Sequence, residues 1–97
     1  MRRIVFAPSF DREVEDIGIY IEERFGEGTR REFVAELADL YTTIASVPGI
    51  GTAHHGYDTS SVGFVFRQNW VFFEYDDNQV HFLHIVDGRR HTPRIGF

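Results

Sequence analysis

Residues 83–91 read LHIVDGRRH and contain the change of character that decides the fold. An apolar run, typical of a buried strand, ends at Gly88, and two adjacent arginines, Arg89 and Arg90, follow it. From 88 to 97 the chain holds three arginines and no acid, whereas the whole chain has a net charge of -5. A cationic segment on an acidic chain is where we look for function.

Upstream of this segment, closely spaced apolar runs predict a sheet. Strands are expected at 62–67, 70–76 and 79–86, with two-residue links between them. Links this short require antiparallel hairpins. A further short strand is expected at 3–7, before Pro8.

Two helices are predicted between the first strand and the others, at 9–26 and 29–47. Apolar residues recur there at spacings of three and four, which is typical of a helix with one buried face. The two stripes are Phe10, Val14, Ile17, Ile21, Phe25 and Phe33, Leu37, Leu40, Ile44, Val47. Thr29 and Glu32 have the spacing of a capping box, so we expect the second helix to begin at Thr29. The short link makes the helices antiparallel neighbours.

These elements predict one α+β domain over 1–97, in the order β-α-α-β-β-β, with an antiparallel curved sheet packed on an antiparallel helical hairpin. The chain has no cysteine, which excludes disulfides and thiolate chemistry. All ten basic residues are arginine, so lysine-based catalysis and a P-loop are also excluded. With no 18-residue apolar run and no signal-peptide pattern, we expect a cytoplasmic protein.

The predicted strands are apolar on both faces, although a helical hairpin can cover only one face of an antiparallel sheet. Two explanations stay open. The sheet can curve over its own loop, or its second face can be a groove for a partner segment.

The polar candidates each have a structural alternative. Arg89 and Arg90 can grip a phosphate or a partner carboxylate, or form salt bridges to the acidic helices. The histidines lack metal-ligand spacing, because His81 and His84 are three apart on a strand and face opposite sides. We therefore expect no metal and no cofactor.

The element order, the helix end at Val47-Pro48-Gly49 and the closing run from His81 to His91 resemble the ParE/RelE toxin superfamily of type II toxin–antitoxin modules, and ParE more than RelE. The resemblance spans essentially the whole chain. It implies an antitoxin, ParD-like and DNA-binding, whose C-terminal segment wraps the toxin. ParE-type toxins inhibit DNA gyrase without being nucleases, so the resemblance implies a gyrase inhibitor and no enzyme.

The alternative within the superfamily is a RelE-like ribosome-dependent mRNA endonuclease. Such toxins use lysines, strand arginines and a C-terminal tyrosine, whereas this chain has no lysine, has Val71 at the strand position and has no tyrosine after Arg90. A third possibility is a derivative that has lost toxicity and only binds a partner.

The resemblance and the charge pattern together give two sets of candidate residues. For toxicity and target contact we expect the tail residues Arg89, Arg90, His91 and Arg94. For antitoxin contact we expect the aromatic sheet residues Phe64, Phe66, Trp70, Phe72, Phe82 and His84, together with the helix edges.

Overall fold

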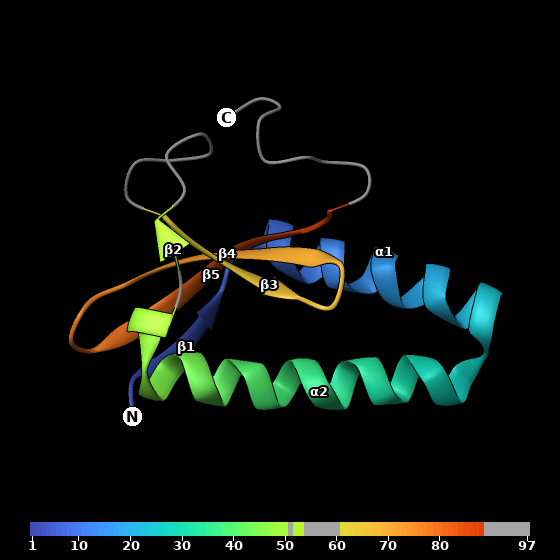
Figure 1. Cartoon of the computed structure of the whole chain (residues 1–97), viewed down its shortest axis with the longest axis horizontal. Coiled ribbons are helices and arrows are strands. Elements are labelled where there is room, and N and C mark those ends of the chain that lie inside the picture. The colour runs from blue at the N-terminus through green and yellow to red at the C-terminus, as the bar shows by residue number, and fades with distance from the viewer. Residues whose placement is uncertain (51, 54–60, 89–97) are drawn as a thin grey trace.

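The computed structural model describes residues 1–50, 52–53 and 61–88, and it places two helices against a five-stranded sheet (Figure 1). In chain order the elements are β1 (Arg3–Phe6), α1 (Pro8–Phe25), α2 (Glu27–Ser46), the 3-10 turn η1 (Pro48–Ile50), β2 (Thr52–Ala53), β3 (Val62–Phe66), β4 (Asn69–Tyr75) and β5 (Gln79–Asp87). The expected α+β class and helical hairpin are confirmed. One element was missed, since no strand was predicted at β2.

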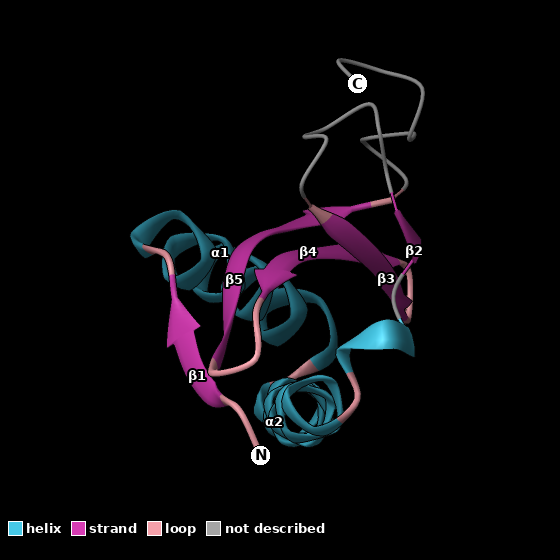
Figure 2. Cartoon of the chain, turned by 90° about the vertical axis from the view of Figure 1, so that its left-hand side faces the viewer, coloured by secondary structure: helices cyan, strands magenta, loops and turns pink. Residues whose placement is uncertain are grey.

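The apolar stripes of both helices form the core with the sheet. Phe10 of α1 and Phe33, Leu37 and Ile44 of α2 are at most 1% exposed. They pack with β4 and β5 in a single cluster that includes Phe82. Figure 2, which looks along α2, shows the sheet arching over this helix. Full burial of a phenylalanine side chain contributes about 1.5–3 kcal/mol, so this cluster is the main stabilising feature of the fold.

The connection between the helices is shorter than predicted. It is the single residue Gly26, whose φ of 96° is a conformation that other residues rarely adopt. Because α2 already begins at Glu27, Thr29 lies inside the helix, and its hydroxyl donates to the carbonyl of Phe25 at 3.3 Å. The predicted capping box is therefore wrong. A glycine that makes the turn itself leaves no N-cap position for Thr29.

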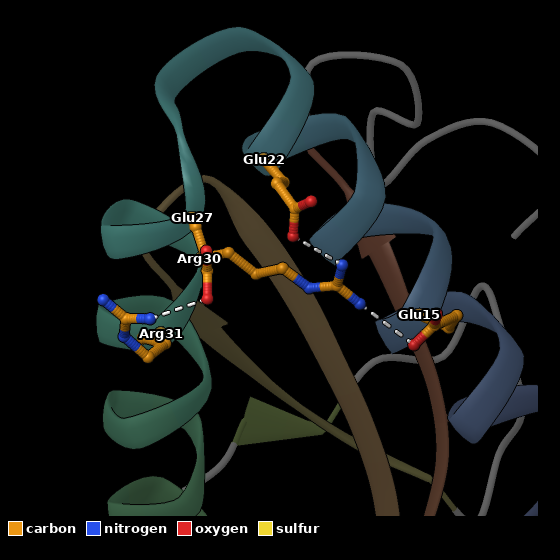
Figure 3. A network of polar contacts seen from close by, with 5 residues as sticks. All are labelled: Glu15, Glu22, Glu27, Arg30 and Arg31. Carbon is orange, nitrogen blue, oxygen red and sulfur yellow. Dashed lines mark hydrogen bonds and ion pairs between the residues drawn. The ribbon is translucent and has the colours of Figure 1, made fainter.

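An arginine crosses from α2 to α1 on the outer side of the hairpin (Figure 3). Arg30 contacts Glu22 at 2.9 Å and Glu15 at 3.2 Å. It lies over Gly18, where a Cβ atom would be only 2.9 Å from the Arg30 Nε. The hydrogen bond that Arg30 donates to Glu22, followed by the charges of both carboxylates, raises the pKa of Arg30 despite some desolvation. This contact ties the two helices together without apolar burial.

The sheet has the order β1-β5-β4-β3-β2, and one of its pairings differs from the prediction. Strands β2 to β5 pair antiparallel with their neighbours, but β1 lies parallel to β5, with Arg3 opposite Gln79 and Phe6 opposite Phe82. The sheet is therefore mixed, not wholly antiparallel. The helical hairpin returns the chain to the side from which β1 started. The antiparallel strands β3 and β4 then follow, and β5 runs in the same direction as β3 and β1.

A β-bulge at Leu83 changes which residues of β5 face the core. Phe73 pairs with Phe82, but the next pair is Phe72 with His84, so Leu83 has no partner. Strict alternation had placed Phe82 and Ile85 on opposite faces of the strand. The extra residue turns both toward the core, and they are 0% and 1% exposed.

Candidate functional site

The helical hairpin extends past the sheet on the side of the α1–α2 turn (Figure 1). A groove of about 550 Å³ opens beside this part of the hairpin. Both helices, the β3–β4 turn and the end of β5 line it: Ile17, Tyr20, Ile21, Phe25, Thr29, Phe33, Arg67, Gln68, Asn69 and Asp87. Phe25 is 64% exposed and Tyr20 37% exposed. Large apolar side chains on the wall of a groove are typical of a surface that binds a partner segment.

The charged wall of this groove is built around Arg67. Its guanidinium donates to the Glu36 carboxylate of α2 through Nε at 3.0 Å and through Nη2 at 2.5 Å. This two-bond contact lowers the pKa of Glu36 and raises the pKa of Arg67. The pair is partly exposed, and it anchors the β3–β4 turn to α2.

The aromatic residues predicted for antitoxin contact do not share one surface. Phe82 is 0% exposed in the middle of the core, within 5.5 Å of the Phe10 ring centroid, so it cannot be part of a contact surface in this fold. Phe64 and Phe66 are only partly buried, but they pack against the same core, and Phe66 lies 5.7 Å from Phe33. The prediction is wrong for Phe82, because Phe82 pairs with Phe73 on the sheet face that the helices cover.

Trp70 and Phe72 belong to a different environment. Their rings stack at 6.0 Å with an interplanar angle of 12°, and their cross-strand partners are Val65 and Gly63. A Cβ atom at Gly63 would lie 3.1 Å from the Trp70 ring, so glycine allows the indole to lie close to β3. Phe72 is fully buried, yet it is not part of the core cluster beneath the helices.

His84, the last residue of that predicted set, lies beside the bulge and contacts α1. Its Nδ1 is 3.2 Å from both carboxylate oxygens of Glu13. The same carboxylate accepts the N–H of Ile85 at 3.1 Å, and the Ser9 hydroxyl donates to the carbonyl of Leu83 at 3.0 Å. Side chains of α1 thus bond to two backbone groups of β5 beyond its last pair with β1, Phe6 with Phe82. For His84 we infer a role in docking α1 on the sheet.

The residues predicted for toxicity, Arg89, Arg90, His91 and Arg94, lie outside the described residues. The described part of the chain contains seven of the ten arginines and fourteen of the fifteen acids. The contrast between an acidic body and a cationic tail is therefore sharper than the net charge suggests.

The described residues were not found to contain a metal centre or a membrane-spanning helix. Within 1–50, 52–53 and 61–88, no group of three or more His, Cys, Asp or Glu could hold a metal ion. No helix there is long and apolar enough to cross a membrane. The position at which RelE-like toxins are expected to carry an arginine is Val71, which is 0% exposed in the core.

Comparison with known families decides the class. Residues 4–92 match the model of the ParE toxin of the type II toxin–antitoxin system parDE. The chain belongs to this ParE toxin family. No curated protein matches the chain in sequence.

Solved structures agree in fold. The chromosomal ParDE toxin–antitoxin system from P. aeruginosa matches with a TM-score of 0.76 at 10% identity, covering 90% of this chain and 96% of that one. The E. coli DinJ-YafQ toxin–antitoxin complex matches with a TM-score of 0.54 at 12% identity, covering 94% and 97%. At these identities the similarity establishes the fold, and the ParE assignment depends on the family match.

The groove itself was missed by sequence reasoning. Its residues Phe25, Ile21 and Ile17 were identified only as members of a helix stripe that faces the core. One signal was available in the sequence: the apolar stripe continues to Phe25, the last residue of α1. The predicted strands are much shorter than the helix, so they cannot cover the whole stripe.

Proposed function

We propose that this ParE-family chain is a toxin that a ParD-like antitoxin neutralises, and that it inhibits DNA gyrase by protein–protein contact. The family match over residues 4–92 supports this proposal most strongly. In this proposal the protein acts as a binding inhibitor, with no cofactor and no chemical step of its own.

The groove beside the Gly26 turn of the helical hairpin is the proposed antitoxin site. Phe25 and Tyr20 present apolar surface there, and an amphipathic antitoxin segment would remove it from water. The body of the toxin is strongly acidic, so the segment that fits has basic residues beside its apolar anchors. This site replaces the aromatic sheet face as the main antitoxin surface, since Phe82 is buried in the core.

The tail residues Arg89, Arg90, His91 and Arg94 are the proposed contact with the target. They belong to the acid-free segment that follows β5. Because repulsion from acids is weakest there, this segment can approach an acidic surface of gyrase or its bound DNA. Arginine suits this role, since its planar guanidinium binds carboxylate and phosphate groups with two parallel hydrogen bonds.

Two assays with purified protein test the target. The toxin should inhibit gyrase supercoiling, and Arg89→Ala/Arg90→Ala or deletion of 92–97 should weaken that inhibition. The matched control is Arg31→Ala, which removes an exposed arginine that pairs with Glu27. Cleavage of mRNA in a purified translation system would instead establish the RelE-like alternative. Inhibition by neither route, together with tight antitoxin binding, would identify a derivative without toxicity.

Co-expression tests the antitoxin. The toxin should be poorly soluble or growth-arresting alone and well tolerated with the product of the adjacent gene. Arrest by the intact toxin should be accompanied by double-strand breaks. A well-behaved monomer that does not bind that product would contradict the proposed groove.

A further inference from the structure

The outer side of the helical hairpin, where Arg30 crosses between the helices, carries a second hollow (Figure 3). Its volume is about 600 Å³, and its apolar part is formed by Val34, Ala35 and Ala38 of α2. All three residues are exposed, and Val34 is 48% exposed. In Figure 1 no described element covers the side of α2 that points away from the sheet. The hollow shares no residue with the groove proposed for the antitoxin.

The rim of this hollow is balanced in charge, unlike the rest of the described body. Its charged residues are two acids and two bases, Glu22, Glu27, Arg30 and Arg31. The described residues as a whole contain seven arginines and fourteen acids, so two copies of the chain repel each other over most of their surface. At the outer hollow this repulsion is weakest, so a second copy can approach most closely there.

The exposed face of α2 is also complementary to itself. Arg31, Ala35 and Asp39 are exposed and follow one another at spacings of four, so they lie along one face of the helix. When a second α2 lies antiparallel across this face, with the two Ala35 side chains at the centre, each Arg31 faces Asp39 of the other copy. The Arg31 side chain is 71% exposed and donates through Nη1 to Glu27 at 2.8 Å. Its guanidinium has further N–H groups with which to bind a second carboxylate.

We propose that two copies of this chain form a two-fold symmetric dimer through the outer face of α2. The small side chains of Ala35 and Ala38 let the two helix axes approach to about 8 Å. A helix of 20 residues is about 30 Å long, so the buried area lies near the lower limit of stable interfaces, about 1,200 Å². The dimer is therefore weak and depends on concentration. It dissociates at the low concentrations of an inhibition assay, where Arg31→Ala remains a control.

Charge reversal on the two sides of the axis tests the arrangement by analytical ultracentrifugation of the full chain. Arg31→Glu and Asp39→Arg each place like charges opposite one another twice, so each variant alone should dimerise with a Kd at least about tenfold higher. An equimolar mixture of the two variants should recover the dimer, because each pair across the axis then joins an arginine to an acid. The matched control is Asp16→Arg, which makes the same change of charge at an exposed position of α1 and should not weaken the dimer.

A cross-link locates the axis independently of charge. The chain has no cysteine, so Ala35→Cys introduces a single thiol at the position where the two copies meet. Mild oxidation should link this variant into a covalent dimer at least about tenfold faster than Ile19→Cys, because only thiols at the axis approach to disulfide distance. Ile19 is a suitable control, since it is 42% exposed and lies on α1. Adding Asp39→Arg to Ala35→Cys should slow the linkage.

The outcomes separate this dimer from other forms of association. A wild-type chain that stays monomeric at every soluble concentration would overturn the proposal, and so would a dimer that tolerates both reversals. Failure of the mixture to recover the dimer, with the Tm of both variants near the wild-type value, would reject the antiparallel pairing. Equal cross-linking at positions 35 and 19 would reject the axis. Antitoxin affinity should be unchanged in both variants, so the dimer and the proposed groove stand or fall separately.

Discussion

The two ends of α1 each carry a phenylalanine of the same apolar stripe, but only one of the two side chains is buried. Phe10, near the start of the helix, is 0% exposed and lies 5.5 Å from the Phe82 ring and 5.9 Å from the Tyr41 ring. Phe25, the last residue of the same stripe, is 64% exposed. The period of a stripe predicts which way its side chains point, whereas the extent of the opposing sheet decides whether they are buried. The end of α1 at Phe10, here called the closed end, contributes stability. The end at Phe25, the open end, offers a binding surface.

The largest effect should come from the closed end. Phe82→Ala should destabilise the protein by about 3–5 kcal/mol, because it leaves a cavity among rings that cannot collapse into it. Phe82 contacts Phe6, Phe10, Tyr41 and Phe73 at centroid distances of 4.9 to 5.9 Å. Chemical denaturation should show the loss as a lower midpoint with an unchanged slope. A loss below about 1 kcal/mol would mean that the core is repacked differently.

A slightly smaller effect is expected in the middle of α2. Leu40 belongs to the core cluster and is 8% exposed, so Leu40→Ala should cost about 2–5 kcal/mol. The value should lie toward the lower part of that range, because the site is thinly covered. Less than about half a kcal/mol lost in a denaturant melt would show that this part of the stripe is not core.

At the open end the expected effect moves from stability to binding. Phe25→Ala should change the free energy of unfolding by less than about 0.5 kcal/mol, since its ring is already largely in water. Antitoxin affinity should fall by at least about tenfold, because the ring is a proposed anchor of the groove. The matched control is Ile19→Ala, an exposed apolar residue of α1 (42%) that does not line the groove. Equal affinities for the two variants would place the antitoxin elsewhere.

The smallest effect is the pH dependence of the Glu36–Arg67 pair. The hydrogen bond from Arg67 lowers the pKa of Glu36 below its ordinary value of 4.5. A lowered folded-state pKa means that the pair stabilises the fold above the unfolded pKa and loses this contribution as the pH falls through the folded one. The Tm difference between the wild type and Glu36→Gln should thus shrink from about pH 6 to about pH 3. A difference that stays constant would show that the pair contributes nothing in solution.

Local sequence signals predicted much of this fold, and their failures have physical causes. Both helices lie within two residues of the expected bounds, because their stripes are long and regular. The capping box at Thr29 failed because Gly26 makes a tighter turn. The parallel pairing of β1 with β5 had no local signal, since four residues of strand carry no information on which neighbour they join.

The candidate site was harder to predict than the fold. The bulge at Leu83 lies beside backbone groups of β5 that bond to Ser9 and Glu13 of α1, and no pattern within β5 indicates these partners. The groove depends on how far the hairpin extends past the sheet, a property of the assembled layers. The pairing of Arg67 with Glu36 joins residues 31 positions apart, and no local pattern indicates it. Only the cationic tail stood out in the sequence, through its composition.

The parallel pairing of β1 with β5 also determines the order in which the molecule can be completed. On the ribosome, Arg3 is made first but must wait for Gln79, 76 positions later, before its strand has a neighbour. The helical hairpin needs only local contacts and can form early, whereas the sheet closes only when β5 has emerged. A nascent chain therefore exposes the apolar faces of both helices until its last strand arrives. An antitoxin already present at that moment would contact the toxin before the toxin's fold is complete.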